Sequence, residues 1–286
     1  MNIPAFSVLT PSYNYARFIG DALASTADQS IGIEHVVVDG ASTDETVDVL
    51  AAADHGRLRW RSEPDRGQSD ALNKAFALSS GDWIGWLNAD EFYLPGAFEA
   101  VAAAIARAPD VDVVVGSAVF VDADARFERL LCHHRFSAAV LRAYGCYLLS
   151  SSVFIRRSAL PAEPWDVDLR TVMDWDLFLA LANAGCRFAT IEQPLSAFRV
   201  HAEQVTAVPM RADDPELQRV RSRWNIPEGA ARRHFGRAQH AALRVVDGCY
   251  REEMRARRRF ARQDMRWFAS ADTSPATALI EAVRND

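Results

Sequence analysis

The chain has 286 residues, of which 49% are hydrophobic and 24% are charged. This is an ordinary globular composition, and the length suits one large domain or a domain with an appendage. No apolar run is long enough to span a bilayer, and residues 1–6 lack the basic and apolar regions of a signal peptide. The four cysteines, Cys132, Cys146, Cys186 and Cys249, follow no metal-ligand spacing. We therefore expect reduced, buried or half-buried thiols in a cytoplasmic protein.

The net charge of −6 is unevenly distributed along the chain. Residues 211–286 contain 16 arginines and 11 acidic residues, a net charge of +5, which leaves −11 for residues 1–210. An acidic main domain is a poor match for nucleic acid, so we expect no nucleic-acid partner. It suits a protein that binds a cation first and an anionic ligand second.

Strand and helix patterns alternate through the first 120 residues. The predicted strands are 6–9, 34–38, 58–60, 83–87 and 111–116, and the predicted helices are 16–27, 43–53, 68–78 and 97–107. This alternation predicts an α/β fold in which a mostly parallel sheet has helices on both faces. Ligands of such sheets bind beyond the carboxyl ends of the strands.

The alternation ends after residue 120. The later patterns predict strands over 127–131, 151–156, 187–191 and 195–200, and helices over 137–144, 174–184, 213–224, 228–247, 249–268 and 275–284. We therefore expect a helical C-terminal extension over 211–286. Its apolar residues favour packing on the main domain or a homodimer contact, and its basic helices leave peripheral contact with anionic lipid as an alternative.

The segment Asn88-Ala89-Asp90-Glu91 follows a buried strand. Acidic side chains in that position often hold Mg²⁺ or Mn²⁺ together with phosphates of the ligand. The segment therefore indicates a phosphorylated substrate such as a nucleotide. The alternative is a turn or helix cap, because Asp and Asn are common after strands.

Two further polar segments follow predicted strands. Asp39 can accept a hydrogen bond from a base or a ribose hydroxyl, or it can simply form a turn with Ser42. Tyr13, beside Thr10, can stack on a base or merely end its strand. Asp70 lies in a polar helix start whose amides can receive an anion. The alternative there is a capped surface helix.

The last candidates lie in the second half of the chain. Asp174 and Asp176 stand two apart at a helix start, so they point in different directions. One can face a cleft and act as a general base, although N-capping is the simpler role for either. His201 follows a predicted strand, where a hydrogen-bonded loop residue is commoner than a metal ligand.

In this order and spacing, the segments resemble those of family 2 glycosyltransferases, the inverting enzymes of the GT-A fold. The resemblance covers about residues 5–205. It rests on residues 10–14, 38–46, 70–75, 81–83, 87–91, 173–177 and 198–201. It implies a Rossmann-like GT-A domain over 1–210, with a nucleotide-sugar half over about 1–120 and an acceptor half over about 121–210.

The resemblance also implies roles for individual residues. Thr10, Tyr13 and Asp39, with Pro11 between them, match positions that hold the base and ribose, and Asp70 matches a position lining the nucleotide or sugar. Asn88-Ala89-Asp90 matches the family's Asp-x-Asp motif, in which the last acid binds the metal and the first lies near the ribose. Asp174 matches the base that activates the acceptor. His201 resembles a further metal ligand of some GT-A enzymes.

Three positions depart from the family pattern. Asn88 replaces an acid of the motif, so metal binding is expected to depend on the nucleotide. Gly40 replaces a second acid after Asp39, which leaves the base identity less defined. Met173 stands where the family often has Glu. The arginine-tryptophan motif of processive synthases is not seen, which favours transfer of one sugar per event.

The resemblance thus implies a Mn²⁺- or Mg²⁺-dependent, inverting hexosyltransferase of polysaccharide or glycoconjugate biosynthesis. We expect the donor to be a nucleotide-diphosphate sugar, with UDP favoured, and the acceptor hydroxyl to belong to a saccharide, a lipid-linked molecule or a small molecule. Two alternatives are a catalytically inactive sugar-nucleotide-binding module and a sugar-nucleotide pyrophosphorylase-like enzyme. The latter needs a glycine-rich phosphate loop where this chain has residues 11–15. We expect a cytoplasmic location, with contact at the inner face of the membrane as an alternative.

Overall fold

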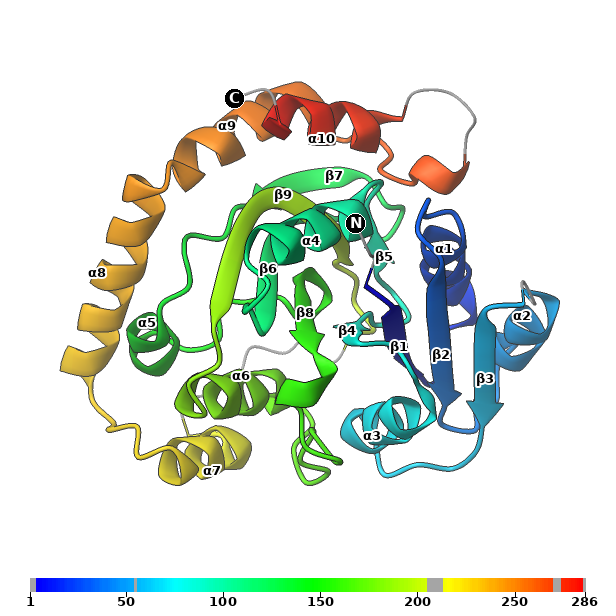
Figure 1. Cartoon of the computed structure of the whole chain (residues 1–286), viewed down its shortest axis with the longest axis horizontal. Helices are drawn as coiled ribbons and strands as arrows, with labels where there is room; N and C mark the ends of the chain where they lie inside the picture. The colour runs from blue at the N-terminus through cyan, green and yellow to red at the C-terminus, as the bar shows by residue number, and fades with distance from the viewer. Residues whose placement is uncertain (1–3, 54–55, 205–212, 270–273, 285–286) are drawn as a thin grey trace.

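The computed structural model describes residues 4–53, 56–204, 213–269 and 274–284. A nine-stranded sheet has the order β3-β2-β1-β4-β8-β6-β9-β5, and β7 pairs with β6 (Figure 1). Over these residues, no helix combines the length and apolarity needed to cross a membrane. The expected boundary at residue 210 falls in 205–212, outside the described residues.

The N-terminal half alternates strands and helices, as expected. Its elements are β1 (Phe6–Ser12), α1 (Ala16–Ala27), β2 (Ile33–Asp39), α2 (Thr46–Ala52), β3 (Leu58–Ser62), α3 (Gln68–Leu78), β4 (Trp83–Trp86), β5 (Phe92–Tyr93) and α4 (Ala97–Arg107). Strands β3, β2, β1 and β4 run parallel to one another. Their carboxyl ends therefore lie at one edge of the sheet.

The second half contributes the rest of the sheet and the C-terminal helices. Its elements are β6 (Val113–Val121), β7 (Phe127–Leu131), α5 (Ala138–Ala143), β8 (Val153–Arg156), α6 (Met173–Asn183), β9 (Phe188–Arg199), α7 (Pro215–Arg223), α8 (Ala230–Val246), α9 (Cys249–Phe260) and α10 (Pro275–Arg284), with 3₁₀ turns at Ser150–Ser152, Arg157–Ala159 and Trp267–Ala269. Strand β8 is antiparallel to both β4 and β6. The sheet is therefore mixed, with its parallel N-terminal part as predicted.

Alternating side chains of β2 show why helices cover both faces. Val37 packs with Ile19 of α1 and Leu50 of α2. Val36 and Val38 point to the opposite face, where they join the core that contains α3 and α6. Successive side chains of a strand point to opposite faces, so a run of valines buries both.

Strand β9 replaces the two strands predicted over 187–191 and 195–200. It is one long strand that curves across the molecule (Figure 1). Pro194 lies inside it, and the pairing with β6 shifts register on either side of Ser117. Proline cannot donate a ladder hydrogen bond, so it is tolerated at such an irregularity. The prediction of two separate strands was therefore wrong, because the ladder continues past the proline.

The C-terminal helices pack against the sheet. Phe260 of α9 and Leu279 of α10 are buried with Phe127 and Leu130 of β7. The helix predicted over 249–268 ends at Phe260 instead. The chain then turns at Arg262, whose φ is 60°, and the amide of Phe127 donates to the carbonyl of Gln263. Pairing with β7 thus ends the helix early.

Candidate functional site

The polar segments after β1, β2 and β4 lie along one edge of the sheet. Ser12 pairs with Asp39, and Asp39 pairs with Ser62, so the ends of β1, β2 and β3 are level. Strand β4 lies on the other side of β1, with Trp86 opposite Leu9. The sheet register therefore gathers residues that are far apart in the sequence, at the edge where ligands of such folds bind.

The loops after β1 and β2 are tied together by Asn14. Its backbone amide donates to Ser42 Oγ at 2.7 Å, and its side-chain Oδ1 accepts from the backbone amide of Thr43 at 2.8 Å. Asn14 has a φ of 58°, a left-handed conformation that asparagine tolerates better than most residues. Tyr13, just before it, is 57% exposed. The phenol ring is thus available at the surface of this edge.

Asp39 is fully buried and forms a turn. Its carboxylate accepts from the amide and hydroxyl of Ser42 at 2.9 and 2.5 Å, and from Ser62 Oγ at 2.6 Å. The turn-forming interpretation of Asp39 is therefore correct. A carboxylate oxygen has more than one acceptor position, so these bonds still allow Asp39 to accept from a ligand.

The side chain of Thr10 is hydrogen-bonded in the protein interior. Its hydroxyl bonds to Nε2 of His35 at 2.8 Å, and Nδ1 of His35 bonds to the hydroxyl of Thr26 at 2.7 Å. All three residues are buried. Pro11 and Ala89 are buried too. The Thr10–His35–Thr26 hydrogen-bond chain was not predicted from the sequence.

Asn88 connects three parts of the site. Its Oδ1 accepts from Gln68 Nε2 at 2.7 Å and from Trp86 Nε1 at 2.8 Å. Its Nδ2 donates to Glu91 Oε1 at 2.7 Å. An aspartate here would lack the NH₂ group that serves Glu91. The departure from the Asp-x-Asp pattern thus has a local reason.

Asp90 and His201 meet across 111 positions of sequence. Nε2 of His201 lies 2.9 Å from Oδ2 of Asp90. The imidazole is buried, and its ring centroid lies 4.6 Å from that of Phe18. Its Nδ1 is buried and has no hydrogen-bond partner among the described residues. The structure thus brings together the two side chains that the sequence nominated as metal ligands.

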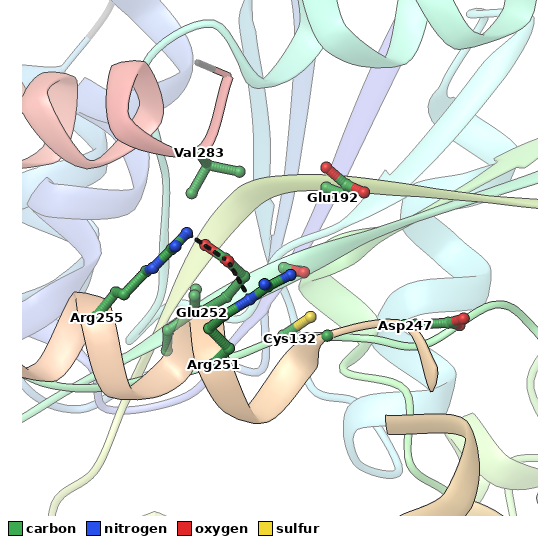
Figure 2. Close-up of a pocket in the computed structure, with 10 residues that line it drawn as sticks. Cys132, Glu192, Asp247, Arg251, Glu252, Arg255 and Val283 are labelled. Carbon is green, nitrogen blue, oxygen red and sulfur yellow. Dashed lines mark hydrogen bonds and ion pairs between the residues drawn. The ribbon is translucent and has the colours of Figure 1, made fainter. Parts of the chain in front are cut away.

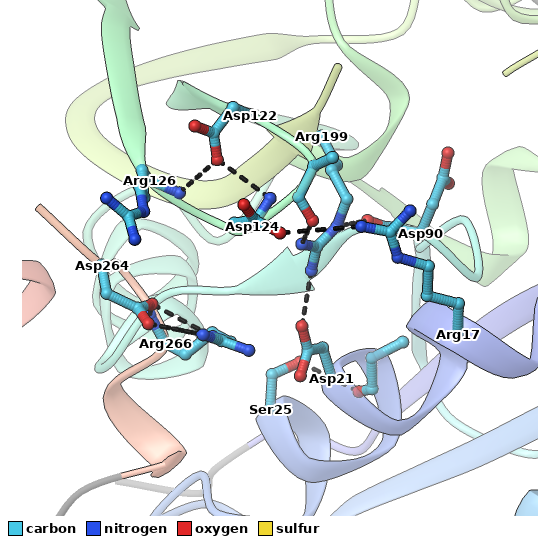
Figure 3. A network of polar contacts seen from close by, with 12 residues as sticks. Arg17, Asp21, Ser25, Asp90, Asp122, Asp124, Arg126, Arg199, Asp264 and Arg266 are labelled. Carbon is cyan, nitrogen blue, oxygen red and sulfur yellow. Dashed lines mark hydrogen bonds and ion pairs between the residues drawn. The ribbon is translucent and has the colours of Figure 1, made fainter. Parts of the chain in front are cut away.

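A buried arginine, Arg199, fixes the backbone of Asp90. Its Nε donates to the carbonyl of Asp90 at 2.9 Å, and its two Nη groups donate to the carbonyl of Ala123 at 2.8 Å and to Asp21 Oδ2 at 2.5 Å (Figure 3). Arg199 is 1% exposed. Arg199 lies in the family-like segment 198–201, and no role was predicted for it. An arginine inside an apolar strand was the available signal, because a buried guanidinium needs several acceptors.

Asp70 occupies the first turn of α3. Burial raises its pKa, but hydrogen bonds from the amide of Arg66 and from Lys74 outweigh burial and leave the pKa below its usual value. Gln68 and Ser69 start the same helix, and Ser69 Oγ donates to the carbonyl of Leu169 at 2.8 Å. This bond ties the helix start to the segment that leads into α6. Asp70 itself is held by its own helix.

Asp174 and Asp176 point in different directions, as their spacing predicted. Asp176 accepts from Arg223 Nη1 at 2.5 Å and from Trp224 Nε1 at 2.7 Å, so it anchors α7. Asp174 accepts from the amide of Trp175 at 2.6 Å and from Cys146 Sγ at 3.5 Å. The N-cap of α6 is Val172, so neither carboxylate is the N-cap residue.

The carboxyl group of Asp174 is less acidic than that of an ordinary aspartate. Burial raises the pKa of its carboxyl group to about 6, although hydrogen bonds from Trp175 and Cys146 oppose the shift. A carboxylate with a pKa near neutrality is a better proton acceptor than an ordinary aspartate. Asp174 therefore has the acidity expected of a general base.

The described residues contain no group of three or more His, Cys, Asp or Glu side chains arranged for a metal ion. Two cavities lie elsewhere, where the C-terminal helices meet the sheet. One, of about 210 Å³, is lined by Cys132, Glu192 and Arg251 among others (Figure 2). The other, of about 490 Å³, lies between α9 and α10. None of the predicted donor-site residues lines either cavity.

Two sequence relatives illustrate what the chain is similar to. A PGL/p-HBAD biosynthesis glycosyltransferase of Mycobacterium bovis is 31% identical over 193 residues, which cover 62% of this chain and 69% of that protein. The chondroitin synthase of Escherichia coli is 35% identical over 100 residues, covering 34% of this chain and 15% of that protein.

Two solved structures share the fold. S. aureus TarS 1-349 in complex with UDP-GlcNAc has a TM-score of 0.64 at 17% identity, over 85% of this chain and 73% of that one. A mannosyltransferase from Pyrobaculum calidifontis in complex with GDP-Man and Mn²⁺ has a TM-score of 0.55 at 18% identity, over 100% of this chain and 81% of that one. The sheet and its helices thus have the GT-A arrangement that the resemblance implied.

The model of the family described as glycosyl transferase family 2 matches residues 7–159, more than half of the chain. That span includes the three strand ends and the Asp90 loop described above. The protein is therefore a glycosyltransferase, and it belongs to family 2.

Proposed function

We propose that the protein transfers one hexose, with inversion, from a nucleotide-diphosphate sugar to an acceptor hydroxyl, in a metal-dependent reaction. The observation that carries this proposal is the 2.9 Å contact between Asp90 and His201 at the carboxyl edge of the sheet. A carboxylate and an imidazole from distant segments meet where the diphosphate of such donors would lie. In this proposal, Asp90 and His201 are the protein's metal ligands.

The chemistry of this pair fits Mn²⁺ or Mg²⁺. Mg²⁺ typically takes one or two carboxylates together with substrate phosphates, and Mn²⁺ also suits carboxylate ligands. The buried Nδ1 of His201 has no hydrogen-bond partner among the described residues, so Asp90 is the one side chain there to which the ring bonds. With Asn88 in place of an acid, the nucleotide must supply the remaining ligands. A bound cation would offset negative charge on the leaving diphosphate.

The donor half of the site supplies contacts for the nucleoside. Exposed Tyr13 is proposed to stack on the base, and Asp39 to accept from the base or ribose through its remaining acceptor positions. Asp70 would line the nucleotide or sugar. We favour UDP as the nucleotide, in line with the UDP-GlcNAc complex of the TarS structure. The GDP-Man complex of the mannosyltransferase makes GDP the competing choice.

Asp174 is proposed as the general base. Its carboxylate would take the proton of the acceptor hydroxyl, and the freed oxygen would attack the anomeric carbon on the face opposite the diphosphate. The bond between that carbon and the diphosphate oxygen then breaks, which inverts the configuration. General-base assistance is typically worth about 10²–10⁴ in rate. The acceptor would be a saccharide, a lipid-linked molecule or a small molecule, and the reaction would take place in the cytoplasm.

Calorimetry with nucleotides tests the metal-ligand proposal. UDP and GDP are titrated into the full chain with and without Mn²⁺, in the original protein, in Asp90→Asn and in Asp82→Asn. Asp82 is exposed at the other end of β4 and is the matched control. We expect Mn²⁺ to strengthen nucleotide binding by the original protein and by Asp82→Asn. In Asp90→Asn, Mn²⁺ should no longer strengthen nucleotide binding. An equal effect of Mn²⁺ in all three proteins would refute the role of Asp90.

A donor-hydrolysis assay separates the enzyme from an inactive binding module. Incubation with UDP-sugars and Mn²⁺ should release UDP slowly without an acceptor, because water can replace the hydroxyl. Nucleotide binding without any release, across donor sugars and candidate acceptors, would favour the binding module. The proposed boundary between a GT-A domain over 1–210 and an extension over 211–286 is tested separately, by limited proteolysis of the full chain.

A further inference from the structure

Helix α8 carries an apolar face on its outer side. Phe235, Val245 and Val246 are 62%, 66% and 69% exposed, and Ala238 and Ala242 between them are exposed as well. The spacing of these five residues places them on one side of an α-helix. We call them the outer strip. No described residue covers them, which is unusual for a helix of a globular protein, whose apolar side normally faces the core.

The inner side of α8 is closely packed, and its Leu243 contacts the hydrophobic core. Gly236 is buried against α5, where a Cβ would lie 2.5 Å from the carbonyl carbon of Ala143. Arg232 Nη1 donates to the carbonyls of Arg142 and Ala143 at 2.8 and 2.7 Å. These contacts need a glycine and an arginine on the inner side. Rotation of α8 to bury the outer strip would break these contacts. The contacts with α5 therefore keep the apolar side of α8 facing outward.

Helix α9 continues the same outer surface. It starts directly after Asp247 and Gly248, and the two helices follow the rim of the molecule as one arc (Figure 1). Tyr250 and Met254 are 40% and 57% exposed, whereas Phe260 on the inner side packs against β7. Apolar side chains thus extend beyond the outer strip onto α9.

Helices α8 and α9 are rich in arginine. Residues 230–260 contain nine arginines and three acidic residues. All three acids are already ion-paired: Asp247 with Arg135, Glu252 with Arg255 and Glu253 with Arg244. Arg257 and Arg258 are exposed on the side of α9 that carries Tyr250 and Met254, whereas Arg233 and Arg237 are exposed on a different side of α8 from the outer strip. The exposed positive charge of this surface therefore lies mainly on α9.

These features match an anionic lipid surface better than a second copy of the chain. In a twofold dimer the same patch meets itself, so two surfaces with an excess of positive charge would be brought together. Anionic headgroups neutralise the arginines, and the acyl boundary accepts the apolar side chains. We propose that α8 and α9 dock the protein on anionic bilayers, with the outer strip inserted at the headgroup boundary. This proposal does not depend on the transfer reaction described above.

Vesicle co-sedimentation of the full chain tests the docking proposal. Vesicles of phosphatidylcholine alone are compared with vesicles that also contain phosphatidylglycerol. We expect binding to the anionic vesicles only, weakened at high salt because exposed charges are screened. Phe235→Ser combined with Val246→Ser should weaken binding at least about tenfold, because each buried apolar side chain contributes to insertion.

Charge variants separate general attraction from docking at this surface. Arg257→Glu with Arg258→Glu should weaken vesicle binding about tenfold or more. The matched control, Arg57→Glu with Arg107→Glu, changes the net charge equally at exposed positions outside this surface and should bind like the original protein. All substituted residues are exposed, and circular dichroism checks that each variant is folded.

Two results would overturn the proposal. One is equal vesicle binding by the outer-strip variant, the charge variant and the control. The other is no vesicle binding together with a dimer in analytical ultracentrifugation that Phe235→Ser with Val246→Ser dissociates. The second result would assign the surface to another copy of the chain.

Discussion

Arg199 joins the Asp90 loop to two other parts of the molecule. The carboxylate partner of this guanidinium comes from α1, and the two carbonyl partners come from the Asp90 loop and the β6–β7 turn. Phe18 and Phe92 lie against it, with their ring centroids 4.9 and 5.6 Å away. A cation buried in this way is stable only while its acceptors stay in place. Arg199 therefore holds the backbone of Asp90 in place.

Replacing Arg199 with alanine should destabilise the fold. The change leaves Asp21 and two carbonyl groups without their donor, so we expect a loss of about 3–5 kcal/mol in the free energy of unfolding. Arg59→Ala is the comparison, because Arg59 forms an ion pair with Glu34 at an exposed position and should cost less than about 1 kcal/mol. Urea denaturation measures both. Equal losses would show that Arg199 is not a structural anchor.

The acidity of Asp174 predicts a pH dependence of activity. A general base acts in its deprotonated form, and the pKa of this carboxyl group is about 6. We therefore expect kcat/KM to fall as the pH drops through about 6, and Asp174→Asn to lose about 10²–10⁴ in rate while nucleotide binding persists. The pH profile of transfer checks the first expectation. A flat profile from pH 5 to 8 would speak against Asp174 as the base.

The same carboxyl group predicts a pH-dependent stability. Its folded-state pKa is raised, so its contribution is fully present below the unfolded-state pKa of about 4 and is lost as the pH rises through about 6. At pH 7 the buried charge is a cost that Asp174→Asn removes. This variant should therefore be more stable than the original protein at pH 7, by about 1–3 kcal/mol, and not at pH 4. Urea denaturation at the two pH values measures the difference, and a gain of equal size at both would contradict it.

At the scale of elements, the periodicity of apolar residues predicted those strands and helices whose tertiary contacts agree with the local sequence pattern. The valine run of β2 and the start of α3 at Gln68 are of this kind, whereas the helix predicted from Thr43 begins at Thr46. The periodicity failed where a segment distant in the sequence determines where an element ends. Pro194 suggested a break, but β6 pairs with β9 on both sides of it. The arginine-rich pattern after Phe260 suggested more helix, but pairing with β7 ends α9.

The candidate site also has some features that could be predicted from the sequence and others that could not. Asp90 could be nominated from the sequence because an acid after a buried strand is a common cation ligand, whereas His201 was nominated only through the family resemblance. The orientation of the Thr10 hydroxyl could not, because it depends on His35 and Thr26 from two other elements. The role of Asn88 also depends on Gln68 of α3. Such contacts are set by the tertiary fold, and a single sequence holds no direct record of them.

The irregular pairing of β6 and β9 predicts a sensitive glycine. A Cβ on Gly116 would lie 2.3 Å from Cγ of Leu195. Gly116→Ala should therefore cost about 1–3 kcal/mol, because a closely packed sheet has no room for the methyl group. Leu195→Ala is costly by itself because Leu195 is buried, but it removes Cγ, so the double variant should lose less than the sum of the two single losses. A double-mutant cycle by thermal or urea unfolding measures this coupling, and purely additive losses would count against the clash.

At the scale of the whole molecule, the C-terminal helices serve as a second layer around the sheet. Helix α7 is tied to α6 through Asp176, α8 to the β7–α5 segment through His134 and His240, and α9 to β7. The net charge of these helices is opposite to that of the first 210 residues. One fold thus combines an acidic region that contains the candidate site with a basic C-terminal region.

The contact between the free thiols of Cys132 and Cys249 predicts that this layer responds to oxidation. Their Sγ atoms lie 2.6 Å apart, although 117 positions separate them in the sequence. Oxidised glutathione could convert the two thiols into a disulfide, itself being reduced to two glutathione thiols. Closing so long a loop restricts the unfolded chain, so the free energy of unfolding should rise by about 4–5 kcal/mol.

Non-reducing electrophoresis and urea denaturation test this expectation. Cys186→Ser should respond to the oxidant like the original protein, and Cys249→Ser should not respond. Unchanged mobility and stability of the original protein after oxidation would contradict the prediction. If the bond forms, α9 becomes covalently fastened to the sheet, and a reducing compartment would hold this protein in its less stable form.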